Sequence, residues 1–497
     1  MREYGVNKIQ ETRMNNDLIL FNMSLSQKIT KNSLIQMGGK FVSLILGMVT
    51  IAIMTRYLGQ EGFGFYITII AFLQFFGILV EFGFSLTAIQ MIADDRRDQS
   101  KIMSNIMTIR IITSFLFIGL APFIIWFFPY AEVVKWGVLI TTLSFFFITM
   151  IQTLTGVFQK ELKMFEVTLA EVIGRVVLVA ITAIVALVSG SIYWILGAIS
   201  LGSLINFILV YWYARKYITL TWSFDFDVWK EVARRSWPIA LSISFNLVYL
   251  RMDTIVLSLT RGAEEVGLYG ATYRIVDILT NLPAVYMGIV LPHLTMYFLE
   301  NKWDELRKLM QQAFDSLMIF AVPIVVGTLL MADKIMVFIA GEEFMDSGPI
   351  LRVLILASAA IFVTSLFGYS VVAVQKQKTM MWGYLVTAAI TLIGYLIFIP
   401  KYGVWGAAWM TVFSEALITI WTFRVVYKTI KFFPKLKIFI KSFLASLVMG
   451  GGMYLVQEQS ILIIMFVAVV LYFGTMLLIR GIRKELLGEV LKADSCR

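Results

Sequence analysis

Long apolar segments separated by short polar ones run along the whole chain, and this pattern predicts transmembrane helices. Each apolar segment is about 20 residues long, which lets an α-helix cross a hydrocarbon core of about 30 Å. No segment shows the alternation typical of a transmembrane strand, and a helix satisfies its own backbone in lipid. We expect about fourteen spans, near residues 33–55, 65–92, 106–128, 133–157, 166–188, 192–214, 236–258, 267–291, 311–331, 349–372, 379–399, 403–424, 439–456 and 460–480.

The composition supports the same class of protein. Of the 497 residues, 59% are hydrophobic and 15% are charged, whereas a soluble domain has about 25% charged residues. The predicted fold class is therefore an all-α polytopic membrane protein. Its loops leave no room for a soluble catalytic domain, and no G-x-x-x-x-G-K-[ST] motif occurs. We therefore expect that the protein is not an enzyme and has no cofactor. With one histidine and one cysteine, we also expect no metal site.

Lysine and arginine in the loops predict how the chain is oriented. If the N-terminus is cytoplasmic, the loops on that side carry 21 of these residues and those on the opposite side carry five. Cytoplasmic loops are enriched in positive charge, so we expect both termini in the cytoplasm. The net charge of +10 then reflects topology, and we expect no nucleic-acid partner.

A short phrase occurs twice, as GQEGFGFY at 59–66 and as GAEEVGLY at 262–269, with the shared pattern G-x-E-x-x-G-[FL]-Y. Two more pairs follow in the same order. Gln159–Lys160 matches Gln375–Lys376, and LGAISLGSLINFILVYWYAR matches WGAAWMTVFSEALITIWTFR. These matches predict a duplicated unit of six helices. In each unit we expect the phrase to close the outer hairpin, with glycines in the turn and the tyrosine at the membrane interface.

An even number of spans in each copy predicts that the two copies insert in parallel, with a site at their interface near the midplane. The expected organisation is a cytoplasmic N-terminal segment (1–31), an N-lobe with spans 1–6 (32–216), a cytoplasmic linker (217–235), a C-lobe with spans 7–12 (236–428), two extra helices (429–480) and a cytoplasmic tail (481–497).

Three stretches carry a resemblance to a known family. They are R-Y-L-G-x-E-x-F-G-x-Y after the first span (Arg56–Tyr66), YLRMDTIVLSLTRGAEEVGLYGATYRIVD (Tyr249–Asp277) and PKYGVWGAA (Pro400–Ala408). With six plus six plus two helices, the chain resembles the polysaccharide transport flippases of the Wzx type. Their superfamily also contains multidrug and toxic-compound extruders and lipid II flippases.

The resemblance implies a function. Members of this family move undecaprenyl-pyrophosphate-linked oligosaccharides across the bacterial cytoplasmic membrane by alternating access, for lipopolysaccharide O-antigen or exopolysaccharide synthesis. The implied partners are the lipid-linked oligosaccharide, the bilayer, and a polymerase with other assembly proteins. The alternatives are a lipid II flippase and a multidrug extruder, although two extra helices and arginines inside the spans speak against the extruder. A membrane glycosyltransferase would need a larger loop.

Ionisable residues inside the spans are the candidate functional residues, because each costs about 2.5–3.5 kcal/mol on insertion scales. Cationic side chains suit a pyrophosphate, which arginine binds through two hydrogen bonds. The predicted substrate-binding residues are Arg251, Arg274, Lys40 and Arg175. Carboxyl groups are candidates for coupling transport to protons or sodium, because burial changes their affinity for protons. These candidates are Glu81, Glu415, Asp253 and Asp277.

Some of these residues have a structural interpretation as well. Glu171 and Arg175 are four residues apart, and Arg274 and Asp277 are three apart, so each pair can neutralise itself within one helix. Lys40 can extend toward the cytoplasm. It lies beside a ridge of small residues that suits close helix packing, formed by Gly39, Ser43 and Gly47.

Arg251 and Asp253 are two residues apart and point to different faces of a helix, so their partners must lie on other helices, in a wet cavity or on a substrate. Glu81 and Glu415 can each make a structural hydrogen bond to a neighbouring helix. Two further arginines lie near span ends and are expected to extend to the interface, namely Arg110 and Arg352.

Overall fold

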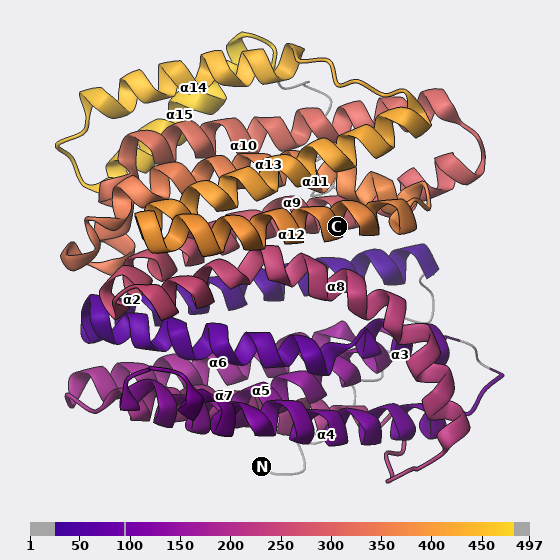
Figure 1. Ribbon diagram of the computed structural model, residues 1–497. Helices are drawn as coiled ribbons and strands as arrows, with labels where there is room; N and C mark the ends of the chain where they lie inside the picture. Colours follow the sequence, from indigo (N-terminus) through magenta and orange to yellow (C-terminus); the bar gives the residue numbers. More distant parts are fainter. Residues whose placement is uncertain (1–24, 94–95, 482–497) are drawn as a thin grey trace, which may run out of the picture. The chain divides into compact units, whose positions relative to one another are not determined.

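The computed structural model describes residues 25–93 and 96–481, and the secondary structure of these residues is helical, with no strand (Figure 1). The predicted N-terminal segment and C-terminal tail, with Cys496, lie mostly outside them. The helices of the first half are α2 (Leu25–Glu81), α3 (Phe84–Ile92), α4 (Gln99–Ile124), η1 (Ile125–Phe127), α5 (Glu132–Lys160), α6 (Met164–Leu187) and α7 (Ile192–Ala214). Those of the second half are α8 (Phe226–Thr260), α9 (Ala263–Leu299), α10 (Trp303–Ala340), η2 (Glu342–Phe344), α11 (Ser347–Ala373), α12 (Gln377–Tyr402), α13 (Val404–Ile430), α14 (Lys437–Leu455) and α15 (Ile461–Leu478).

Twelve helical stretches of the described residues are long and apolar enough to cross a membrane. The first of them, residues 38–92, is 55 residues long and changes direction at Gly59, whose φ is 65°, so it supplies two crossings. The 35-residue helix α8 is not among the twelve but is long enough for another. These helices account for the fourteen predicted spans and confirm the all-α polytopic class.

The helices cluster into two compact units, which are described separately. Of the described residues, those within 1–50, 76–128 and 135–241 form unit 1. Its core lies between helices α3 to α7 and includes Ala88, Met103, Leu154, Ala170 and Val210. These side chains are apolar along one face of each helix, and van der Waals packing stabilises their contacts, because lipid tails are as apolar as the side chains themselves.

Of the described residues, those within 51–75, 129–134 and 242–497 form unit 2. Its larger core joins α9, α10, α11 and α13 and includes Met287, Met310, Leu366 and Ile418. The helices α14 and α15 lie beside α10 (Figure 1), where a second core contains Met449, Ile464, Tyr472 and Met476. The predicted division into lobes remains a prediction.

The repeated phrase lies at equivalent junctions, as predicted. Its first glycine is the break inside α2, Gly59, and its counterpart Gly262 immediately precedes α9. The second glycine is not in the turn: Gly64 lies inside α2 and Gly267 inside α9. The expectation that both glycines serve the turn is therefore wrong for the second one, because its role is close packing.

That packing is reciprocal. A methyl group placed on Gly64 would collide with the carbonyl oxygen of Ala263 and lie 3.1 Å from the nitrogen of Gly267. A methyl group placed on Gly267 would collide with the carbonyl oxygen of Gln60 and lie 3.2 Å from the nitrogen of Gly64. Ala263 occupies in the second copy the place that Gln60 occupies in the first. The two copies of the phrase thus pack against each other, backbone on backbone.

The tyrosines that end the phrase differ from the expectation. Tyr66 is half-buried, but Tyr269 is fully buried and its hydroxyl donates to Oδ2 of Asp253 at 2.6 Å. The second tyrosine is therefore not an interfacial anchor. It lies inward because a carboxylate on α8 requires a donor.

Replacing either second glycine with alanine should destabilise the protein. Gly→Ala inside a helix normally stabilises a protein by about 0.5–1 kcal/mol. The matched control is Gly288, which lies on the same helix as Gly267 and whose added methyl group would contact nothing within 4 Å. We expect Gly64→Ala and Gly267→Ala to lower the melting temperature of the purified protein and Gly288→Ala to leave it unchanged or raise it. Equal melting temperatures for all three variants would contradict the close packing.

Candidate functional site

A cationic cluster in unit 2 brings three of the predicted residues together. Nη2 of Arg251 on α8 donates to both carboxylate oxygens of Asp277 on α9, at 3.0 and 3.3 Å. Nη1 of Arg274 lies 3.8 Å from Oδ2 of the same carboxylate. Two guanidinium groups thus share one carboxylate, which leaves a net positive charge. As predicted for Arg251, its partner lies on another helix.

This cluster lines a narrow cleft. Its other walls come from α9, including Gly270 and Tyr273, and from the part of α2 between Ile67 and Gln74. The guanidinium of Arg251 lies 5.1 Å from the ring centre of Tyr273, a distance at which the ring attracts a cation. The cleft has an empty volume of about 320 Å³, of which little is wide enough for a water molecule. It presents positive charge and an amide, Gln74, in a protein-lined space.

Asp253 points away from this cleft, as its spacing from Arg251 predicts, and is fully buried. Its Oδ1 accepts hydrogen bonds from the amide of Thr254 at 2.5 Å and from the Thr254 hydroxyl at 3.1 Å. Its Oδ2 accepts from Tyr269 on α9 at 2.6 Å and from Thr411 on α13 at 3.4 Å. Four oxygen and nitrogen donors therefore hold the carboxylate between three helices.

Glu415 on α13 is 3% exposed. Within the part of the chain that the structure describes, no hydrogen bond or ion pair to its carboxyl group is seen, although the Thr419 hydroxyl donates to its backbone carbonyl at 2.7 Å. Burying a carboxylate without a partner is costly. Glu415 therefore remains a candidate for binding a proton or a cation, and the expected hydrogen bond to a neighbouring helix is not seen in this part of the chain.

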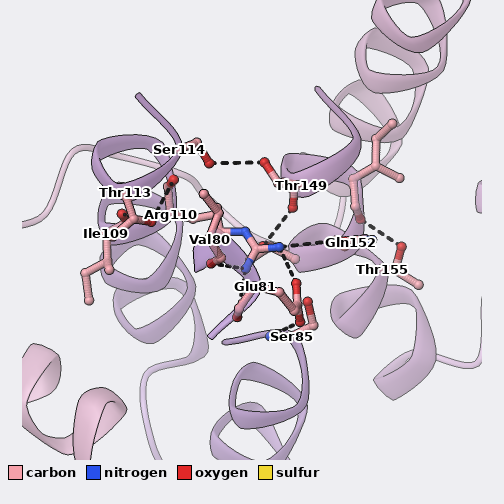
Figure 2. Close-up of polar contacts among 12 residues, drawn as sticks. Val80, Glu81, Ser85, Ile109, Arg110, Thr113, Ser114, Thr149, Gln152 and Thr155 are labelled. Atoms are coloured by element: carbon pink, nitrogen blue, oxygen red, sulfur yellow. Dashed lines mark hydrogen bonds and ion pairs between the residues drawn. The ribbon is translucent and has the colours of Figure 1, made fainter. Parts of the chain in front are cut away.

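In unit 1, Glu81 lies where a helix breaks inside the membrane span (Figure 2). The helix α2 ends at Glu81 and α3 begins at Phe84, with positive φ angles at Phe82 and Gly83. Arg110 on α4 closes this break. Its Nη1 donates to the carbonyls of Val80 and Glu81 at 2.9 and 3.1 Å, and its Nη2 pairs with the Glu81 carboxylate.

Arg110 is fully buried, so the expectation that it extends to the interface is wrong. The physical reason is the broken helix, whose last carbonyls have no intrahelical donor. Nη2 of Arg110 also donates to Gln152 on α5 at 3.1 Å (Figure 2), and Ser85 donates its amide to Glu81 at 3.4 Å. For Glu81 this geometry favours the structural alternative, and its role in ion coupling stays a prediction.

The predicted ridge on the first span packs against α6, as expected. A methyl on Gly39 would collide with Thr168, and the hydroxyl of Ser43 donates to Glu171 at 2.6 Å. Glu171 lies 3.6 Å from Arg175, so the pair forms within one helix. Lys40 is exposed. Glu171 and Arg175 are both partly exposed, at 32% and 40%.

Arg352 was also expected to extend to the interface. It instead donates Nη2 to Asp333 at 2.6 Å and Nε to the carbonyl of Leu329 at 3.1 Å. That carbonyl precedes Met331, where α10 is kinked. The sequence offered no sign of the kink, because no proline or glycine occurs at it.

Several side chains of these sites are neutral, so a charge inside a span does not reveal them. They are Gln74 and Tyr273 in the cleft, Tyr269 and Thr411 around Asp253, and Gln152 beside Arg110. The duplicated phrase was the one signal available for Tyr269, since it ends the second copy.

Comparisons with known proteins were made for the whole chain. Residues 29–298 match the model of a family described as polysaccharide biosynthesis protein. The chain is similar to the putative O-antigen transporter of Shigella dysenteriae, with 23% identity over 75% of this chain and 93% of that one. It is also similar to the probable low-salt glycan biosynthesis flippase Agl15 of Haloferax volcanii, with 22% identity over 35% of this chain and 36% of the relative.

Solved structures share the fold. The lipid II flippase MurJ in an inward closed conformation gives a TM-score of 0.74 with 18% identity, over 90% of this chain and 99% of that one. A multidrug resistance MATE family transporter of the MOP superfamily in an inward-facing conformation gives 0.62 with 12% identity, over 80% and 98%. At these identities the likeness concerns the fold alone.

Breaking the Arg110 pair should reduce stability strongly. Removing one partner of a buried ion pair costs about 3–5 kcal/mol because the other charge stays buried. We expect Glu81→Gln to lower the melting temperature of the purified protein, and Arg110→Met to lower it further because two backbone carbonyls also lose their donor. The surface pair Lys302–Glu300 provides a control, Glu300→Gln, which should have little effect. If Glu81→Gln melted at the wild-type temperature, the structural interpretation of Glu81 would be contradicted, and the ion-coupling interpretation would remain.

Proposed function

Because the chain belongs to the polysaccharide biosynthesis protein family, we propose that it is a flippase that moves a lipid-linked oligosaccharide across a membrane. The single observation that carries this proposal beyond the family is the net positive charge of the cluster that Arg251, Arg274 and Asp277 form. One carboxylate shared by Arg251 and Arg274 leaves a cation to bind an anionic cargo. The O-antigen transporter and glycan flippase among its relatives support a saccharide cargo.

The finer statement is an undecaprenyl-pyrophosphate-linked repeat unit for surface polysaccharide synthesis. Pyrophosphate suits arginine, whose planar group binds two oxygens at once. We place the protein in the bacterial cytoplasmic membrane with both termini in the cytoplasm, next to a polymerase and other assembly proteins. Lys40 and Arg175 in unit 1 are proposed to bind the same cargo, since both side chains are at least partly exposed.

Two other cargoes remain as alternatives. The fold of MurJ favours lipid II, whose pyrophosphate would meet the same arginines. The MATE fold favours a drug, but a cationic drug would be repelled by a site with two arginines for each carboxylate. The chemistry inside the span is recognition of an anion, and no bond-breaking step is proposed.

Alternating access would use the contact between the two copies of the phrase. The cleft is too narrow here for a pyrophosphate, so it must widen during transport. Its α2 wall begins at Ile67, one helical turn beyond Gly64, where the two backbones meet. Arg56 and Gln60 hold the same stretch against the end of α10 and η2, through the carbonyls of Phe338 and Glu343. We propose that this contact is closed here and opens to release cargo.

Transport would be driven by an ion gradient, with Asp253 and Glu415 as the proposed coupling residues. Asp253 has four donors around one carboxylate, and Glu415 is buried. Asp277 is less suited because it is occupied by arginines. A proton or a sodium ion bound at either acidic residue would change the packing of α13 against its neighbours.

Arg251 should be required for transport rather than for folding. In a strain that lacks this protein, we expect Arg251→Ala to abolish surface polysaccharide at matched protein levels. Arg251→Lys should restore part of it, because lysine keeps the charge but lacks the planar group. Arg235→Ala is the matched control, since Arg235 lies on the same helix and also pairs with a carboxylate, that of Glu231, but lies outside the cleft. Wild-type polysaccharide in Arg251→Ala would contradict the cationic site.

Glu415 should set the ion dependence of transport. In proteoliposomes we expect Glu415→Gln to bind cargo but to lose the dependence of flipping on pH or on sodium, because an amide does not exchange a proton or carry a charge. Glu300→Gln, outside the spans, should keep the wild-type dependence. If Glu415→Gln retains it as well, Glu415 is structural and Asp253 is left as the coupling candidate.

A further inference from the structure

The segment between α7 and α8 is extended, yet it lies along a membrane-spanning helix. Residues 218–225 have no regular secondary structure, and they run beside the first turns of α4, which is a candidate span. Both belong to unit 1. An extended backbone at the edge of a membrane needs hydrogen-bond partners, because its amides are not paired within the segment.

The polar side chains of α4 supply these partners. Ser100, Ser104 and Thr108 lie four residues apart on α4, and they accept from alternate amides of the segment, those of Thr219, Thr221 and Ser223, at 3.2, 3.1 and 3.3 Å. The spacing fits because two residues of extended chain and four residues of helix both advance by about 6 Å. The fourth alternate amide, that of Asp225, donates to the buried Asn105 at 2.9 Å.

An ion pair fixes the end of the segment. Lys101 lies 2.6 Å from Asp225, and this hydrogen bond holds the pKa of Asp225 below its usual range. The pair therefore stays charged at neutral pH. The backbone amides of alternate residues thus attach the segment to α4. The side chains of the residues between them can face away from α4.

Those intervening side chains are large aromatic groups. Trp222, Phe224 and Phe226 are 67%, 58% and 74% exposed. The rings of Trp222 and Phe224 stack at 6.5 Å, and Trp229 contacts Phe224 and Phe226. Three exposed aromatic residues in five positions form an apolar edge that is costly to leave in water.

The depth of this edge identifies what covers it. The span that contains α4 is 29 residues long, from Gln99 to Phe127, and about 20 residues fill the hydrocarbon core. The span exceeds the core by about nine residues, so the start of α4, where Lys101 pairs with Asp225, lies at the boundary between the headgroups and the hydrocarbon. Tryptophan and phenylalanine with polar neighbours are the residues that bind this layer.

We propose that the edge formed by Trp222, Phe224 and Phe226 is inserted into the phospholipid leaflet, where it anchors the connection between the two repeats. In the orientation proposed above, this is the cytoplasmic leaflet. Because apolar burial drives the insertion, it needs no anionic lipid and is insensitive to salt.

Depth-dependent quenching tests this proposal. In a Cys496→Ser background, single cysteines at 222 and 224 are labelled with a small fluorophore, and the protein is reconstituted into phosphatidylcholine vesicles with or without spin-labelled lipid. The lipid-side control is position 115, where Phe115 is 78% exposed on α4. The aqueous control is position 230, where Lys230 is exposed on the first turns of α8. Monodisperse elution from a sizing column confirms that each variant is folded.

We expect the labels at 222 and 224 to lose fluorescence to spin-labelled lipid as the label at 115 does, and to be protected from iodide, unlike the label at 230. High salt should change neither result. Labels at 222 and 224 that respond only to iodide would overturn the proposal, since the edge would then face water. Labels that respond to neither quencher would also overturn it, since protein would then cover the edge. The outcome does not depend on transport, so it is independent of the proposed function.

Discussion

Helix ends in and beside a membrane leave backbone carbonyls without donors, and the structure meets this constraint with cationic side chains from other helices. Arg110 donates to the last carbonyls of α2, and Arg56 donates to those of α10. The same arrangement recurs at the kink of α10 and at the ends of α12, α13 and α15, through Arg352, Arg261, Arg307 and Lys441. A positive group at a helix C-terminus also interacts favourably with the helix dipole.

This use of cations separates two classes of basic residue. Those that bind carbonyls hold broken or ending helices together, and their loss would damage the fold. Arg251 and Arg274 instead face one carboxylate in a cleft, so a positive charge remains available there. The reciprocal contact at Gly64 and Gly267 lies close to the same cleft, on two of the helices that line it. In the proposed function, recognition of an anion and closure of the site would therefore involve neighbouring parts of α2 and α9.

The sequence predicted the helical fold because hydrophobic length alone identifies a membrane span. It also predicted the equivalent places of the two phrases, the close packing of the ridge that contains Ser43, and, as one of three possibilities, a partner for Arg251 on another helix, since spacing along a helix determines which face a residue occupies. It was wrong for Arg110 and Tyr269. Their burial depends on a broken helix and on a buried carboxylate, which arise from contacts between distant segments and leave no local pattern. The domain division and the roles of the site residues remain predictions.

Flipping by a cross-linked protein tests the central claim most directly. Cysteines at 60 and 343, where Gln60 donates to the carbonyl of Glu343, are joined by a cleavable thiol reagent in a Cys496→Ser background, and lipid-linked oligosaccharide is followed in proteoliposomes. We predict flipping before cross-linking, arrest after it, and recovery when the link is cleaved. Flipping that continues while the residues are joined would contradict opening at the repeated phrase. No flipping of this cargo by the free protein would contradict the function itself.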